Sequence, residues 1–122
     1  MVISPFVEEL VFRGVLLRMF GRACGTMTSI LITSLLFAIS HTDPVQMIYV
    51  FALGVVLCIV RLCSGSLWNA VALHLTFNLS GIVLATSELE LPGITFAVIP
   101  ILAVVSFMLA CSGKRKMRSK TK

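Results

Sequence analysis

Apolar residues dominate this chain in long runs, and short breaks of polar residues, glycine or proline separate the runs. A helix that crosses a bilayer needs about 20 predominantly apolar residues. The pattern therefore predicts an all-α fold, a polytopic transmembrane helix bundle of about five helices. The expected helices cover about residues 5–21, 26–40, 44–62, 66–85 and 93–111. The second is short for a full crossing, so we expect it to be tilted or to stop below the membrane surface.

Two helix starts carry recognisable signals. Ser4 precedes Pro5, and Asp43 precedes Pro44. Serine and aspartate are favoured N-caps, and proline is favoured at the first helical position. We therefore expect the first helix to be capped by Ser4 and the third to open at Pro44.

The composition is that of a membrane protein. Hydrophobic residues make up 58% of the chain and charged residues 12%, whereas soluble domains contain about 45–50% apolar and about 25% charged residues. We expect residues 1–112 to form one intramembrane domain and residues 113–122 to form a basic cytoplasmic tail.

The net charge of +5 reflects this tail, because six of the ten lysines and arginines lie in residues 114–122. A basic segment that directly follows an apolar run is typical of the cytoplasmic flank of a membrane helix. We therefore expect contact with the lipid bilayer and no nucleic-acid partner. An alternating path through the membrane places Arg18, Arg22 and Arg61 on the same side as the tail.

Three charged side chains interrupt the first apolar run, namely Glu8, Glu9 and Arg13. A charge at the centre of a membrane helix costs about 2.5–3.5 kcal/mol on insertion scales, so such residues are candidate functional groups. Glu9 and Arg13 are four residues apart, share a helix face and can pair. Glu8 then remains free to act as a general base. The alternative is an interfacial helix end, where acids favour the N-terminal dipole.

Both histidines of the chain lie at helical spacing from a second residue, in Phe37-x-x-x-His41 and His74-x-x-x-Asn78. An asparagine amide can donate to an oxyanion, and an imidazole can bind a metal or donate a proton. The alternatives are an interfacial or capping histidine at His41, and hydrogen bonding between helices at His74 and Asn78.

Taken together, these side chains supply what amide hydrolysis by activated water requires, without a nucleophilic serine or cysteine. We expect all six polar candidates to converge on one cavity: Glu8, Glu9, Arg13, His41, His74 and Asn78.

In chain order, Glu8-Glu9-x-x-x-Arg13, Phe37-x-x-x-His41 and His74-x-x-x-Asn78 resemble the three motifs of the CPBP intramembrane proteases. This family comprises the type II CAAX prenyl endopeptidases and the bacterial Abi proteins linked to bacteriocin processing and self-immunity. The resemblance, over about residues 4–80, implies a helical endopeptidase in a bacterial plasma membrane. Its implied substrate is a peptide, a prenylated peptide or a bacteriocin-like precursor.

By motif position, the resemblance makes Glu8 the water-activating base, with Glu9 and Arg13 as a supporting pair. It makes His41 a partner in water activation or metal binding, and the third motif the oxyanion or ligand pair. Family members are called metalloproteases, so zinc or another divalent metal is an expected cofactor, with Glu8, His41 and His74 as its ligands. Glutamate-activated water without a metal is equally consistent with these residues.

Two other functions stay open at this point. Family members usually carry further helices before the first motif, so the early position of Glu8 also favours a non-enzymatic immunity or partner-binding protein of the same fold. A proton-coupled transporter element is a third reading, since chains of acidic and basic residues serve as proton relays. The run at 93–111 contains no charged residue to continue such a relay.

Overall fold

The computed structural model describes residues 3–86, and these residues are helical wherever they form regular structure. The all-α prediction is therefore confirmed for this part of the chain. The expected helix at 93–111 and the basic tail at 113–122 lie outside the described residues. Residues up to Leu79 belong to one compact unit, and the unit that begins at Ser80 is described only for the end of one helix.

The first helical stretch combines α1 (Ile3–Glu9), the π-helical segment η1 (Leu10–Leu16) and α2 (Leu17–Cys24). An uninterrupted α-helix over 5–21 was expected, and this was wrong at its centre. Ser4 lies within α1, where its hydroxyl donates to the Glu8 carboxylate, so it is not the expected N-cap.

Burial explains the wider turn of η1. Pro5, Glu9, Arg13 and Leu17 are all buried, and they repeat every four residues. An α-helix has 3.6 residues per turn, so a repeat of four drifts by roughly 40° at each step. A π-helical turn, bonded from residue i to i+5, holds more residues. It therefore keeps these four side chains close to one face of the stretch.

The next helices match their predicted ranges closely. They are α3 (Thr26–Ile39), α4 (Pro44–Ser64) and α5 (Leu67–Thr86). Asp43 caps α4 as expected, because its carboxylate accepts from the backbone N–H groups of Val45 and Gln46. Gly65 ends α4 with φ of 71°, and its N–H donates to the Arg61 carbonyl. A left-handed glycine at this position is a common helix stop.

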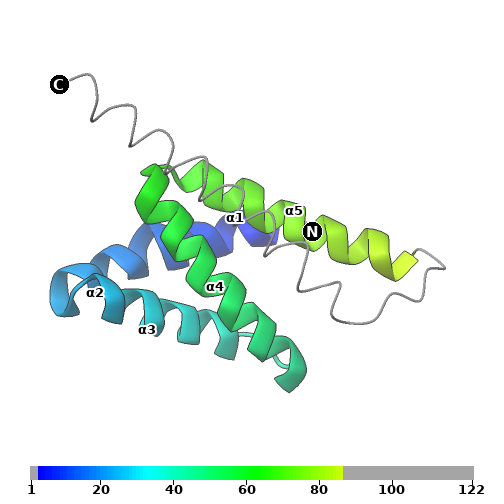
Figure 1. Ribbon diagram of the computed structural model, residues 1–122, viewed down its shortest axis with the longest axis horizontal. Coiled ribbons are helices and arrows are strands. Elements are labelled where there is room, and N and C mark those ends of the chain that lie inside the picture. Colours follow the sequence, from blue (N-terminus) through cyan, green and yellow to red (C-terminus); the bar gives the residue numbers. More distant parts are fainter. Residues whose placement is uncertain (1–2, 87–122) are drawn as a thin grey trace, which may run out of the picture. The chain divides into compact units, whose positions relative to one another are not determined.

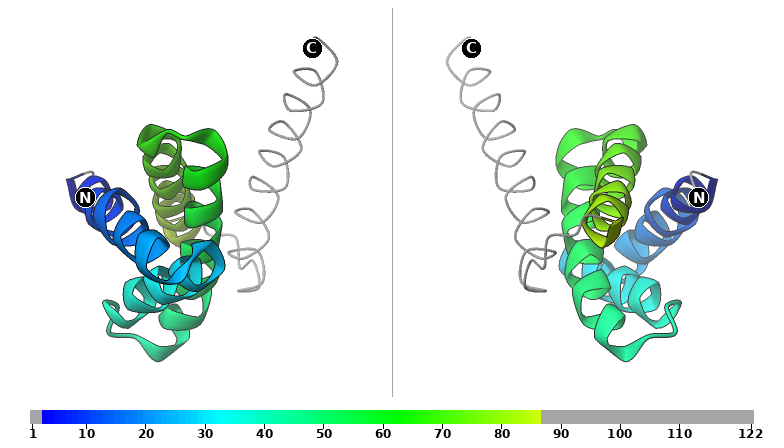
Figure 2. Two further views of the ribbon diagram at one scale, coloured as in Figure 1. Left: turned by 90° about the vertical axis from the view of Figure 1, so that its left-hand side faces the viewer. Right: turned by 90° about the vertical axis from the view of Figure 1, so that its right-hand side faces the viewer.

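Helix α4 packs against α3 and also contacts η1, α2 and α5 (Figures 1 and 2). On one side, Cys58 of α4 joins Leu17 of α2 and Ile30 of α3 in an apolar cluster. On another side, Leu57 of α4 contacts Ala70 of α5 in a second cluster. The first stretch and α5, which are distant in sequence, are thus both positioned against α4.

The distribution of polarity suits a lipid surrounding. Large apolar side chains such as Met27, Ile48 and Trp68 are exposed, whereas Glu9 and Arg13 are fully buried. In a membrane, ionisable side chains face the protein interior, and apolar side chains face lipid. By length and composition, one of the helices described between residues 3 and 86 is long enough to span a bilayer, namely Pro44–Ser64. Two shorter apolar helices accompany it.

Gly54 allows the close approach of α3 to α4. A methyl group at this position would lie 3.1 Å from Ser34 Cβ and 3.2 Å from Ser34 Cα. Carbon atoms prefer a separation of about 3.5–4.0 Å. Only glycine therefore leaves room for α3 here.

We expect Gly54→Ala to reduce the free energy of unfolding by about 1–3 kcal/mol, the usual cost of overpacking a tight core. Gly81→Ala is the matched control, because a methyl group there meets no described atom within 4 Å. Unfolding of the detergent-solubilised variants, followed by circular dichroism, measures the difference. Equal stability of Gly54→Ala and the parent would contradict the close packing.

Candidate functional site

A buried ion pair forms the base of the site. Arg13 Nη1 lies 2.9 Å from Glu9 Oε1, and both side chains are fully buried. The predicted pairing of these residues is therefore confirmed. Arg13 Nη2 also donates to the Gly54 carbonyl oxygen at 3.2 Å. Arg13 thus links the first helical stretch to α4 and fixes the position of Glu9.

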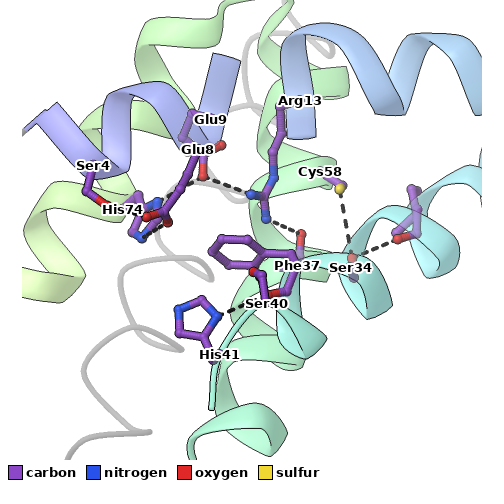
Figure 3. A network of polar contacts seen from close by, with 12 residues as sticks. Ser4, Glu8, Glu9, Arg13, Ser34, Phe37, Ser40, His41, Cys58 and His74 are labelled. Carbon is purple, nitrogen blue, oxygen red and sulfur yellow. Dashed lines mark hydrogen bonds and ion pairs between the residues drawn. The ribbon is translucent and has the colours of Figure 1, made fainter. Parts of the chain in front are cut away.

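His74 of α5 joins this pair. Its Nδ1 lies 2.9 Å from Glu9 Oε1, and the side chain is only 4% exposed. An ionised carboxylate is an acceptor only, so Nδ1 carries the proton of this hydrogen bond. Glu9 therefore fixes the orientation of the imidazole ring, so that the other ring nitrogen, Nε2, faces Glu8 (Figure 3).

Glu8 is the accessible carboxylate of the site. Its side chain is 30% exposed, and its Oε2 lies 3.8 Å from His74 Nε2. This distance exceeds that of a hydrogen bond, so Oε2 faces the imidazole without being bonded to it. The Ser4 hydroxyl donates to Oε1, the other oxygen of the same carboxylate. Adjacent glutamates thus have different environments, one fully buried and one accessible.

Phe37 lies at the centre of the polar groups (Figure 3). The Arg13 guanidinium lies over its ring, with Cζ 4.3 Å from the centroid. The rings of His41 and His74 both meet it edge to face, with centroid separations of 5.3 Å and 5.6 Å. The sequence predicted no role of its own for Phe37, although its spacing of four residues from His41 was a signal that it belongs to the same site.

Two of the six predicted residues lie apart from the network. His41 is half-buried, and its Nδ1 lies 3.0 Å from the Phe37 carbonyl oxygen. Its ring contacts the ring of Phe37, which also contacts the ring of His74. Asn78 is exposed, one turn beyond His74 on the same helix, and makes no polar contact among the described residues. Glu8, Glu9, Arg13 and His74 are the residues that the structure brings together.

The candidate metal ligands do not form a group in this arrangement. Glu8 and His74 are close to each other, but Phe37 lies between His74 and His41. Within residues 3–86, no three histidine, cysteine, aspartate or glutamate side chains are placed to hold a metal ion. The Glu8, His41 and His74 set thus stays a prediction, and these positions do not fit one shared ion.

Comparison with known proteins identifies the family of the chain. The family described as Rce1-like, type II CAAX prenyl endopeptidase, matches residues 1–80. An Escherichia coli protein described as an uncharacterized 24.3 kDa protein is 34% identical over 87 residues, covering 67% of this chain. The matched region is 40% of the length of that relative. No solved structure matches the chain.

Proposed function

The chain belongs to the Rce1-like family of type II CAAX prenyl endopeptidases, and we propose that it is an intramembrane endopeptidase that cleaves a peptide bond with activated water. The observation that carries this proposal is the accessible carboxylate of Glu8 facing His74, whose ring is held by the buried Glu9. An accessible base beside an oriented imidazole is what hydrolysis without a covalent intermediate needs.

In the proposed reaction, Glu8 Oε2 accepts a proton from a water molecule as the water oxygen attacks the scissile carbonyl carbon. The hydroxyl of Ser4 holds Oε1 and leaves Oε2 for the water. The proton then passes to the amide nitrogen as the carbon–nitrogen bond breaks. Glu8 is thus a carboxylate again at the end of the reaction, and the products are a carboxylic acid and an amine.

His74 and Asn78 are assigned to the oxyanion of the tetrahedral intermediate. His74 donates from Nε2 when it is protonated, and the buried Glu9 stabilises that cation through Nδ1. Asn78 shares the helix face and is exposed, so its amide is accessible to a substrate. His41 remains a candidate partner in water activation, although the Phe37 ring lies between it and His74.

We expect His74→Ala to lower the cleavage rate by about 10²–10³-fold, the usual cost of one lost oxyanion donor. The assay uses the full chain in liposomes, with farnesylated and unmodified fluorogenic peptides, and identifies new termini by mass spectrometry. Trp68→Ala is the control, because Trp68 is an exposed residue of the same helix. Equal loss in both variants would argue against a role for His74 in the chemistry.

Chelation separates the two forms of water activation. Since the described donors do not converge on one ion, we expect a divalent-metal chelator to leave the rate unchanged within about twofold. Rates before and after dialysis against chelator, and after addition of zinc, give the answer. Loss on chelation followed by recovery with zinc would contradict this expectation and favour the Glu8, His41 and His74 metal set.

The substrate and setting are part of the same proposal. The family name supports a peptide or prenylated-peptide substrate. The Escherichia coli relative supports a bacterial source, and a bacterial plasma membrane is the proposed location. A bacteriocin-like precursor is a further candidate substrate. If the parent chain cleaves none of these peptides, the non-enzymatic immunity or partner-binding function takes precedence.

A further inference from the structure

A cavity lies where the first helical stretch meets α3 and α4, and Arg13 is one of the residues that line it. It has a volume of about 260 Å³, and three arginines line it together with small and hydroxyl-bearing residues. The full set of lining residues is Arg13, Leu17, Arg18, Gly21, Thr26, Ser29, Arg61, Leu62 and Gly65. No carboxylate is among them, so the described lining is strongly positive.

The guanidinium groups of this cavity have unused donors. Arg13 is fully buried, and its Nε has no hydrogen-bond partner in the described part of the chain. The Nε atom of Arg61 is also buried and has no hydrogen-bond partner among the described residues. Within residues 3–86, neither Arg18 nor Arg61 takes part in an ion pair. A buried donor without a partner costs about 1–3 kcal/mol, more when charged, so an anion would relieve this cost.

The start of α3 adds a further positive end to the cavity. Gly25 precedes this helix and provides no side-chain cap, and Thr26 and Ser29 both line the cavity. The first backbone N–H groups of a helix lack partners within the helix, and the helix dipole favours an anion there. The helix end and the buried Arg13 are independent features that favour the same kind of ligand.

We propose that this cavity binds a phosphate group, with Arg18 and Arg61 as its entrance ligands and Arg13 at its base. Guanidinium groups bind phosphate oxygens in pairs of parallel hydrogen bonds. Basic pockets between membrane helices are a known setting for anionic lipid head groups. The phosphate is that of a lipid head group or a free phosphate ion, and both present the same tetrahedral anion.

The test measures binding to the full chain in detergent by isothermal titration calorimetry. The probes are inorganic phosphate, short-chain phosphatidic acid and short-chain phosphatidylcholine. We expect phosphatidic acid to bind and phosphatidylcholine to bind at least tenfold more weakly. Competition by inorganic phosphate at millimolar concentration identifies free phosphate as a second source, and lack of competition restricts the ligand to lipid. Failure of both phosphatidic acid and inorganic phosphate to bind would overturn the proposal.

Substitutions locate the site. Arg18→Gln and Arg61→Gln are each expected to weaken phosphatidic acid binding about 10- to 100-fold, since each removes charged hydrogen bonds. Arg22→Gln is the matched control, because Arg22 is exposed on the same helix as Arg18 and does not line the cavity. If all three variants bind equally, the interaction is with surface charge and the proposal fails. Peptide cleavage is not part of the readout, so this result is independent of the proposed activity.

Discussion

Replacement of Glu8 by glutamine is expected to reduce peptide cleavage by about 10²–10⁴-fold, the range that a positioned general base contributes. Glutamine keeps the size of the side chain and can still accept from the Ser4 hydroxyl, but it does not accept a proton from water. Because Glu8 is 30% exposed and outside the buried pair, its replacement should leave the fold intact. Cleavage of the membrane-presented peptide and thermal unfolding are measured on the same preparation.

Asp43→Asn is the matched control for this variant. It also converts one carboxylate to an amide, at an exposed helix start where asparagine caps about as well as aspartate. Its cleavage rate should equal that of the parent. Full activity in Glu8→Gln would remove the general base from the mechanism and favour the binding-protein function. Lost activity with a lowered unfolding temperature would show that the glutamate is needed for the fold instead.

The helices could be predicted because their signals are local. Asp43 before Pro44 marks the start of α4, and its carboxylate accepts the expected backbone bonds. Gly65 marks the end of the same helix. The π-helical segment η1 could not be predicted from such signals. Its cause is the burial of side chains every four residues against α4 and α5, which depends on the tertiary structure.

Part of the site could also be predicted, since Glu9 and Arg13 are four residues apart on one helix. The contact of Glu9 with His74 joins residues 65 positions apart, and no local spacing specifies it. The motifs indicated that these residues belong to one site, without indicating which atoms meet. The separation of His41 from the network also depends on where Phe37 packs.

Part of the arginine-lined cavity could be predicted from the sequence. The alternating path placed Arg18 and Arg61 at the same side of the membrane, and both line this cavity. They were interpreted there only as flanking charges. Arg13 could not be connected with them from the sequence, because only the tertiary structure shows that a residue paired with Glu9 also lines the cavity.

Arg13→Met is expected to reduce the free energy of unfolding by about 3–5 kcal/mol, the usual cost of leaving one partner of a buried ion pair alone. Methionine fills much of the same space without charge. Glu9 then remains buried with His74 as its remaining hydrogen-bond partner. A Glu9→Gln, Arg13→Met double variant removes both charges of the pair, and its glutamine oxygen can still accept from His74. We therefore expect the double variant to be more stable than Arg13→Met alone.

Arg22→Met, at an exposed position, is the control and should change the free energy of unfolding by less than about 0.5 kcal/mol. Unfolding in detergent is followed by circular dichroism for the parent, the single variants Glu9→Gln and Arg13→Met and the double variant, which together complete the cycle. Additive losses from the two substitutions would mean that Glu9 and Arg13 do not stabilise each other, which would contradict the 2.9 Å contact between them.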